Sequence, residues 1–173
     1  MSKILKIKAR QVFDSRGNPT IEAEIYSKNL SASAICPSGA STGTYEAFEK
    51  RDNKNKRYLG KSVLSGVNLI NSKISKKLRG LNIHDQERID TILINLDGTR
   101  QKVKLGANTI LAVSMAAKKL SAKIKKIPLY KSIANGKILP LPLMNVINGG
   151  AHANNSLRIQ EFMIRPDKAE TFT

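Results

Sequence analysis

The sequence has little cysteine and few aromatic residues, with one Cys, no Trp, four Phe and four Tyr. Because Cys36 is alone, an internal disulfide and a cysteine-based zinc site are both excluded. No apolar run approaches the roughly 20 residues that a membrane-spanning helix needs. The amino terminus carries a lysine but no apolar segment of the kind found in secretory signals. These absences predict a cytoplasmic globular protein without a membrane span.

Acidic residues are also scarce, since 13 Asp and Glu stand against 30 Lys and Arg in 173 residues, giving a net charge of +17. Such an excess is typical of proteins that bind nucleic acid, an anionic membrane or an acidic substrate. The lysines are spread along the chain, apart from one cluster at Lys118, Lys119, Lys123, Lys125 and Lys126. Lys, Ile and Asn are abundant together, so compositional drift is the alternative explanation.

Apolar periodicity predicts three strands and then helices in the first part of the chain. The strands are expected at 4–13, 20–27 and 31–36, where alternation is clearest in the second. Helical spacing is expected over 63–78, 84–96 and 108–125. Strands followed by helices indicate an α+β domain containing a three-stranded antiparallel meander.

Prolines then become frequent, and two short apolar runs at 143–147 and 159–164 resemble strands. We therefore predict an α+β domain at 1–126, a linker at 127–139 and the beginning of a second domain at 140–173. A pair of strands is only marginally stable in water by itself. The second region is thus interpreted as the start of a larger domain.

The loop 37–43 consists almost wholly of small residues, which suits either a surface turn or a segment that closes over a ligand. Its sequence from Gly39 to Gly43 also matches the five-residue nucleophile-elbow pattern, with Ser41 as nucleophile and His152 as base. That interpretation requires a helix directly after the serine.

Glu161 lies within an apolar strand-like run, where a buried and unpaired carboxylate is costly. A structural ion pair and an active-site acid are equally good explanations. His152 lies in a loop between a Gly-Gly pair and two asparagines, and a lone loop histidine is usually a surface residue. His84 stands at a helix start beside Asp85, so we expect it to cap the helix or pair locally.

Several short motifs occur in the order found in the enolase family, and the resemblance extends from about residue 3 to 166. They lie at 14–20, 37–43, 96–99, 105–108, 128–130, 148–152 and 160–163. The resemblance implies an α+β amino-terminal domain followed by the first strands of an incomplete (β/α)8 barrel. A barrel of this type typically has about 250 residues, so most of it is expected beyond residue 173.

The resemblance also implies the reversible dehydration of 2-phosphoglycerate to phosphoenolpyruvate in glycolysis and gluconeogenesis. In this superfamily a Lys or His base removes a weakly acidic proton next to a carboxylate, and Mg²⁺ stabilises the ene-diolate. Two Mg²⁺ ions per complete site are expected, with most ligands beyond this chain. The implied roles are Ser41 as a metal ligand, Glu161 as a catalytic residue, and Ala40, His152, Gln160 and Glu161 as substrate contacts, with Ser38, Gly39, Thr42 and Gly43 in a lid loop.

Because the general base and the metal carboxylates of the family are missing from the sequence, we expect the 173-residue chain alone to be inactive. Full-length enolases generally dimerise through contacts that involve this domain, so a homodimer is expected for the whole protein. The alternative function is a basic fragment that binds RNA or an anionic surface, since bacterial enolases join RNA-processing assemblies and occur on cell surfaces. No aromatic stacking set supports that alternative.

Overall fold

The computed structural model describes residues 2–39, 42–53, 56–136 and 138–171. The chain forms two compact units, which divide after Ala134. Each unit is described separately below.

The first unit contains an antiparallel sheet in the order β1-β2-β3, formed by β1 (Lys6–Phe13), β2 (Pro19–Ser27) and β3 (Leu30–Cys36). Ile21, Ala23 and Ile25 of β2 are fully buried on one face, as their alternation predicts. The β1–β2 turn is held by Asp14, whose Oδ1 accepts hydrogen bonds from the backbone N–H groups of Arg16 and Asn18, both at 2.9 Å.

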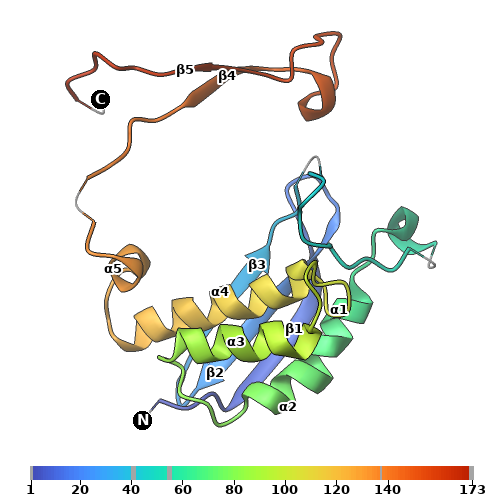
Figure 1. Ribbon diagram of the computed structural model, residues 1–173, viewed down its shortest axis with the longest axis vertical. Coiled ribbons are helices and arrows are strands. Elements are labelled where there is room, and N and C mark those ends of the chain that lie inside the picture. The colour runs from blue at the N-terminus through green and yellow to red at the C-terminus, as the bar shows by residue number, and fades with distance from the viewer. Residues whose placement is uncertain (1, 40–41, 54–55, 137, 172–173) are drawn as a thin grey trace. The chain divides into compact units, whose positions relative to one another are not determined.

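Helices follow the sheet, and Figure 1 shows α3 and α4 lying alongside each other in front of the strands. Their bounds are η1 (Arg57–Gly60), α1 (Leu64–Leu69), the π-helical segment η2 (Ile70–Ile74), α2 (Ser75–Leu78), α3 (Gln86–Asp97), α4 (Ala107–Ile124) and α5 (Leu129–Ile133). The three predicted helices are therefore present, and the first includes one π-helical turn. Gly98 ends α3 in the left-handed conformation, with φ of 68°.

The core of the first unit lies between the sheet and these helices. Its fully buried side chains include Ile21 and Ile25 from β2, Leu93 from α3 and Leu120 from α4. Gly66 lets α1 approach closely, because an added Cβ would lie 2.7 Å from both Ile21 Cδ1 and Thr109 Oγ1. The fold class predicted for this part of the chain is confirmed.

The loop after α3 is built around the buried carboxylate of Asp97, which is 1% exposed. It accepts hydrogen bonds from the backbone N–H groups of Thr99 at 3.0 Å and Leu105 at 2.6 Å, and from the Thr99 hydroxyl. Burial raises the pKa of Asp97, but these hydrogen bonds favour the charged form and leave the pKa below its usual value.

One prediction about a histidine is wrong. Asp85, not His84, caps α3, since its side chain accepts a hydrogen bond from the backbone N–H of Arg88. The His84 ring instead lies 2.8 Å (Nδ1 to Oγ) from Ser121 of α4. Its partner is distant in sequence because the start of α3 packs beside α4, which the local pattern does not reveal.

The second unit contains one antiparallel hairpin, formed by β4 (Met144–Asn148) and β5 (Glu161–Ile164). The pairing is regular at both ends and shifts register between Asn145 and Ile147. The short 3-10 helix η3 (Gly150–His152) lies in the long connection between the strands.

Candidate active site

The connection between β4 and β5 is folded back on itself by backbone hydrogen bonds. The Gly149 N–H donates to the carbonyl of Gln160 at 3.1 Å, and the Gly150 N–H donates to the carbonyl of Leu157 at 2.8 Å. Two residues further along the connection, the His152 N–H donates to the Gly149 carbonyl at 3.0 Å. These bonds continue the hairpin into the loop and carry His152 to the start of β5.

Gly149 is required at its position for a steric reason. A Cβ there would lie 2.5 Å from the Ile159 carbonyl oxygen and 2.6 Å from that of Leu157. Backbone atoms cannot move aside as a flexible side chain can, so the close approach of the two arms of the loop depends on glycine.

Three of the predicted site residues meet at the base of this loop. His152 Nδ1 lies 2.7 Å from Glu161 Oε1, and His152 Nε2 lies 3.0 Å from Gln160 Nε2. The side chains of His152 and Glu161 are 23% and 33% exposed. Glu161 is thus half-buried and paired, so the condition of a buried, unpaired carboxylate does not hold.

The two contacts of the imidazole define its hydrogen-bonding state. When Nδ1–H donates to the Glu161 carboxylate, a neutral ring has its lone pair on Nε2, which accepts a hydrogen bond from the Gln160 amide. Because its acceptor is an ionised carboxylate, the Nδ1–H bond to Glu161 is charge-assisted with the neutral ring. The arrangement can therefore hold a proton between a carboxylate and an imidazole.

Asn155 supports the same loop and was not expected from the sequence. Its Nδ2 donates to the Asn148 carbonyl at 3.0 Å, and its Oδ1 accepts from the Leu157 N–H at 3.0 Å. The second bond is an Asx turn, in which an asparagine side chain bonds the N–H two residues on. Two consecutive asparagines in a loop are the signal that could have indicated it.

The beginning of the small-residue loop is held by ionic groups of the first unit. The half-buried Ser38 donates from Oγ to Glu49 Oε2 at 2.8 Å and accepts from Arg51 Nη2 at 3.2 Å. Arg16 Nη2 donates to the Ser38 carbonyl at 2.8 Å, and Arg51 also pairs with Glu49 at 2.7 Å. Glu49 and Arg51 belong to no motif recognised in the sequence, so their contacts with Ser38 were not predicted.

The rest of that loop is exposed where the structure describes it. Gly39, Thr42 and Gly43 are exposed, and the Gly43 N–H donates to Glu46 Oε2 at 3.0 Å. The predicted substrate contact Ala40 and the predicted metal ligand Ser41 lie outside the described residues. Residues 42–50 form a turn and irregular chain, so the helix that a nucleophile elbow requires does not follow the loop, and the hydrolase interpretation lacks its structural basis.

Metal-binding side chains do not gather in the described part of the chain. No three His, Cys, Asp or Glu residues there come together where they could hold a metal ion. The described residues thus do not fit a Mg²⁺ centre by themselves. Over the same residues, the structure has no helix long and apolar enough to span a membrane.

Comparison with known proteins gives consistent matches along the chain. A family model described as the enolase N-terminal domain matches residues 4–133, and one described as the enolase C-terminal TIM barrel domain matches residues 136–173. A curated relative from Pelagibacter ubique (strain HTCC1062), named enolase, is 82% identical over 175 residues. The alignment covers 100% of this chain and 42% of the relative, so the chain spans less than half of that protein's length.

Proposed function

Because the chain belongs to the enolase family, we propose that it supplies the amino-terminal domain and part of the active site of an enzyme that interconverts 2-phosphoglycerate and phosphoenolpyruvate. The observation that carries this proposal is the 82% identity to a curated enolase across the whole chain. The contact of His152 with Gln160 and Glu161 supports it independently, since residues expected to share a substrate pocket lie within hydrogen-bonding distance.

In this proposal the three residues act at the hydroxyl that leaves the substrate. Glu161 is the catalytic carboxyl group, and the proton that it shares with His152 can pass to the departing hydroxide. His152 orients Glu161 through Nδ1 and contacts the substrate, and Gln160 fixes the ring through Nε2. The backbone conformation of the loop at Gly149 keeps His152, Gln160 and Glu161 together.

The small-residue loop closes over the substrate as a lid in this proposal. Ser38, held by Arg51 and Glu49, is its fixed end, and Gly39 and Gly43, with Thr42 between them, provide its conformational freedom. Ala40 is assigned to substrate contact and Ser41 to a metal ion. Mg²⁺ is the cofactor expected for the whole enzyme, in which it would neutralise charge developing on the substrate carboxylate; most of its ligands are expected outside this chain.

The test joins residues 1–173 to the part of the Pelagibacter relative that the chain does not span. The joined protein is expected to form phosphoenolpyruvate from 2-phosphoglycerate, followed by ultraviolet absorbance, whereas the 173-residue chain alone is expected to form none. A folded joined protein without dehydratase activity would overturn the proposed function. Activity of the 173-residue chain alone would show that its residues suffice.

Within the joined protein, E161Q tests the catalytic assignment with a change that keeps the size of the side chain. We expect the rate to fall by about 10² to 10⁴, the usual contribution of a positioned acid or base. The control is E170Q, which changes an exposed carboxylate of the same unit and should leave the rate unaltered. Equal rates for both variants would remove Glu161 from the mechanism.

The remaining predictions concern organisation and partners. We propose the α+β domain at 1–126, a linker at 127–139 and the barrel start at 140–173; the division of the chain after Ala134 falls within that linker. A homodimer of the whole protein and a cytoplasmic location stay predictions. The same holds for binding to RNA-processing complexes or cell surfaces.

A further inference from the structure

The three-stranded sheet has two outer edges, along β1 and β3. In antiparallel strands, alternate residues turn both their N–H and their C=O away from the neighbouring strand. Such an edge is a template on which another extended chain can add. Natural sheets cover it or place charges along it, lysine above all.

The β1 edge is covered by one side chain from the helical layer. Asn71 of η2 accepts from the Ala9 N–H at 2.8 Å and donates to the Ala9 carbonyl at 3.0 Å. Its amide thus occupies both backbone groups, as a neighbouring strand would. The side facing η2 is therefore already occupied at the middle of β1.

The β3 edge is covered by two lysines of α4. Lys123 Nζ donates to the Ser31 carbonyl at 2.9 Å, and Lys119 Nζ donates to the Ser33 carbonyl at 3.3 Å. The lysines are four residues apart and so lie on one face of the helix. The serines are two residues apart and so turn the same way from the sheet.

We propose that Lys119 and Lys123 guard the β3 edge against pairing with β3 of a second copy of this chain. Each ammonium group occupies a carbonyl that an added strand would need. The same two charges face an identical pair on an incoming copy, and like charges brought together in this way repel. Because a lysine ammonium group can only donate hydrogen bonds, the two lysines protect the edge by occupying backbone carbonyls of β3 and by their positive charge.

This assignment gives a structural role to two lysines of the basic cluster at 118–126. It also predicts what their loss should do. Once the carbonyls of Ser31 and Ser33 are released and the charge is removed, a second β3 can pair in antiparallel fashion, giving self-association through the sheet.

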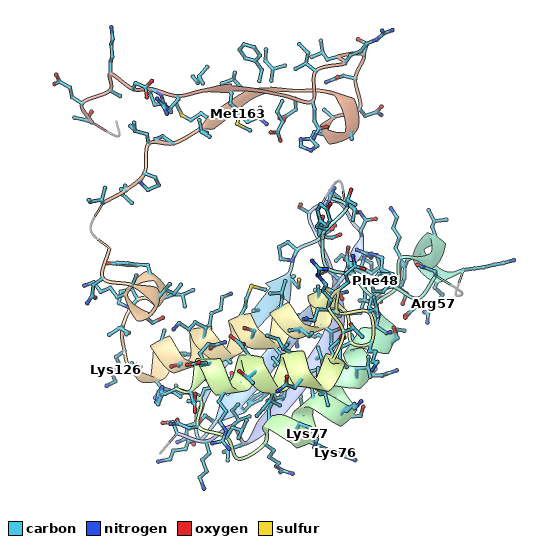
Figure 2. All side chains as sticks on the ribbon, viewed as in Figure 1. Phe48, Arg57, Lys76, Lys77, Lys126 and Met163 are labelled. Carbon is cyan, nitrogen blue, oxygen red and sulfur yellow. The ribbon has the colours of Figure 1, made fainter. Side chains whose placement is uncertain are left out.

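The experiment compares two double variants that lose the same positive charge. K119Q/K123Q opens the edge, while K76Q/K77Q changes two exposed lysines of α2 (Figure 2). Self-association is measured by sedimentation equilibrium at physiological salt. We expect the dissociation constant of K119Q/K123Q to be at least about tenfold lower than that of K76Q/K77Q, which corresponds to about 1.4 kcal/mol of association free energy. Equal constants would overturn the proposal, and any association through the β4–β5 hairpin is common to both variants.

Two further variants make the test specific to the edge. S33P added to K119Q/K123Q places proline where the N–H faces outward, a position that edge strands accept; it should restore the weaker association. K119R/K123R keeps donors and charge and should behave as the unchanged chain. Association that persists with S33P, or that appears in the arginine variant, would show that the lysines do not act through the β3 edge.

Discussion

The two antiparallel sheets in the described part of the chain differ in where their apolar side chains lie. In β2 the side chains of Ile21 and Ile25 are fully buried beneath the helical layer. In the hairpin of the second unit, Val146 is 52% exposed and Phe162 is 55% exposed. Met163, labelled in Figure 2, is 45% exposed.

The difference teaches that an apolar strand sequence does not by itself produce burial. The β1–β3 sheet has polar residues such as Glu22 and Glu24 on its second face and needs only one covering layer. The hairpin strands are apolar on successive residues, a pattern typical of strands covered on both faces. A two-stranded hairpin without such cover has marginal stability in water.

Truncating one leucine in each unit tests this comparison, and it should give the largest difference in stability. Leu93 of α3 is 0% exposed, and Leu143 next to β4 is 66% exposed. We expect L93A to lower the free energy of unfolding by about 2–5 kcal/mol, because it removes buried methyl groups and leaves a cavity. L143A is expected to change it by less than about 0.5 kcal/mol. Urea unfolding followed by circular dichroism measures both, and similar losses would contradict the contrast between the units.

Cys36 allows the packing of the first unit to be measured chemically. Burial, with a smaller contribution from the charge of Glu49, raises the pKa of its thiol to about 11. Since the thiolate is the reactive form and an exposed cysteine has a pKa of about 8.5, alkylation near pH 8 should be on the order of 100-fold slower in the folded chain than in urea. Rapid alkylation without denaturant would show that the β3 end of the core opens readily.

The periodicity of the sequence was sufficient for the sheet and the long helices, because one face of each is buried against the other. The alternation of Ile21, Ala23 and Ile25 and the spacing of α4 are examples. The π-helical turn was not predictable, since side-chain periodicity hardly changes over one turn. The bonds from Lys119 and Lys123 to β3 left no signal either, because their acceptors are backbone carbonyls of any residue type.

The candidate site, too, could be predicted only in part from the sequence. His152, Gln160 and Glu161 were singled out mainly by their place in family motifs, and the hairpin brings them together across the loop. Their mutual contacts depend on the fold of the loop around Gly149, which is held by backbone hydrogen bonds between residues several positions apart. His84 was misassigned because its partner Ser121 is remote in sequence.

Two aspartates, one in each unit, test whether buried polar groups contribute more to stability than exposed ones, as we expect for the apolar groups. Asp97 is buried and accepts from the backbone of Thr99 and Leu105, whereas Asp167 is 53% exposed in its pair with Arg165. D97N should destabilise the protein by about 1–3 kcal/mol at neutral pH, because buried donors lose their acceptor. D167N should have almost no effect.

The pKa of Asp97 gives the pH range of that difference. Its pKa is lowered in the folded state, so its contribution is complete above the unfolded value of about 3.9 and is lost as pH falls through the folded value. The gap in unfolding free energy between the unchanged chain and D97N should therefore narrow in acid. A gap that is constant with pH would mean that the charge of Asp97 has no part in it.

The smallest expected effect concerns His84, which joins the start of α3 to α4 within the first unit. Burial, and then the positive charge of Lys125, lower the pKa of its imidazole. As the pH falls, the unfolded chain therefore takes up a proton on His84 before the folded chain does. The contribution of His84 to stability is complete above a pH of about 6.5 and declines as the pH falls below that value.

H84Q keeps a polar side chain that can bond Ser121 but does not titrate, so the unfolding free energy of this variant should vary less between about pH 7.5 and pH 5. K125Q should flatten the same curve by removing the repulsion. K76Q serves as the charge control, because Lys76 is an exposed lysine that is not among the charges lowering the pKa of His84. If H84Q and the unchanged chain follow parallel curves, the proton that destabilises the first unit in mild acid binds elsewhere.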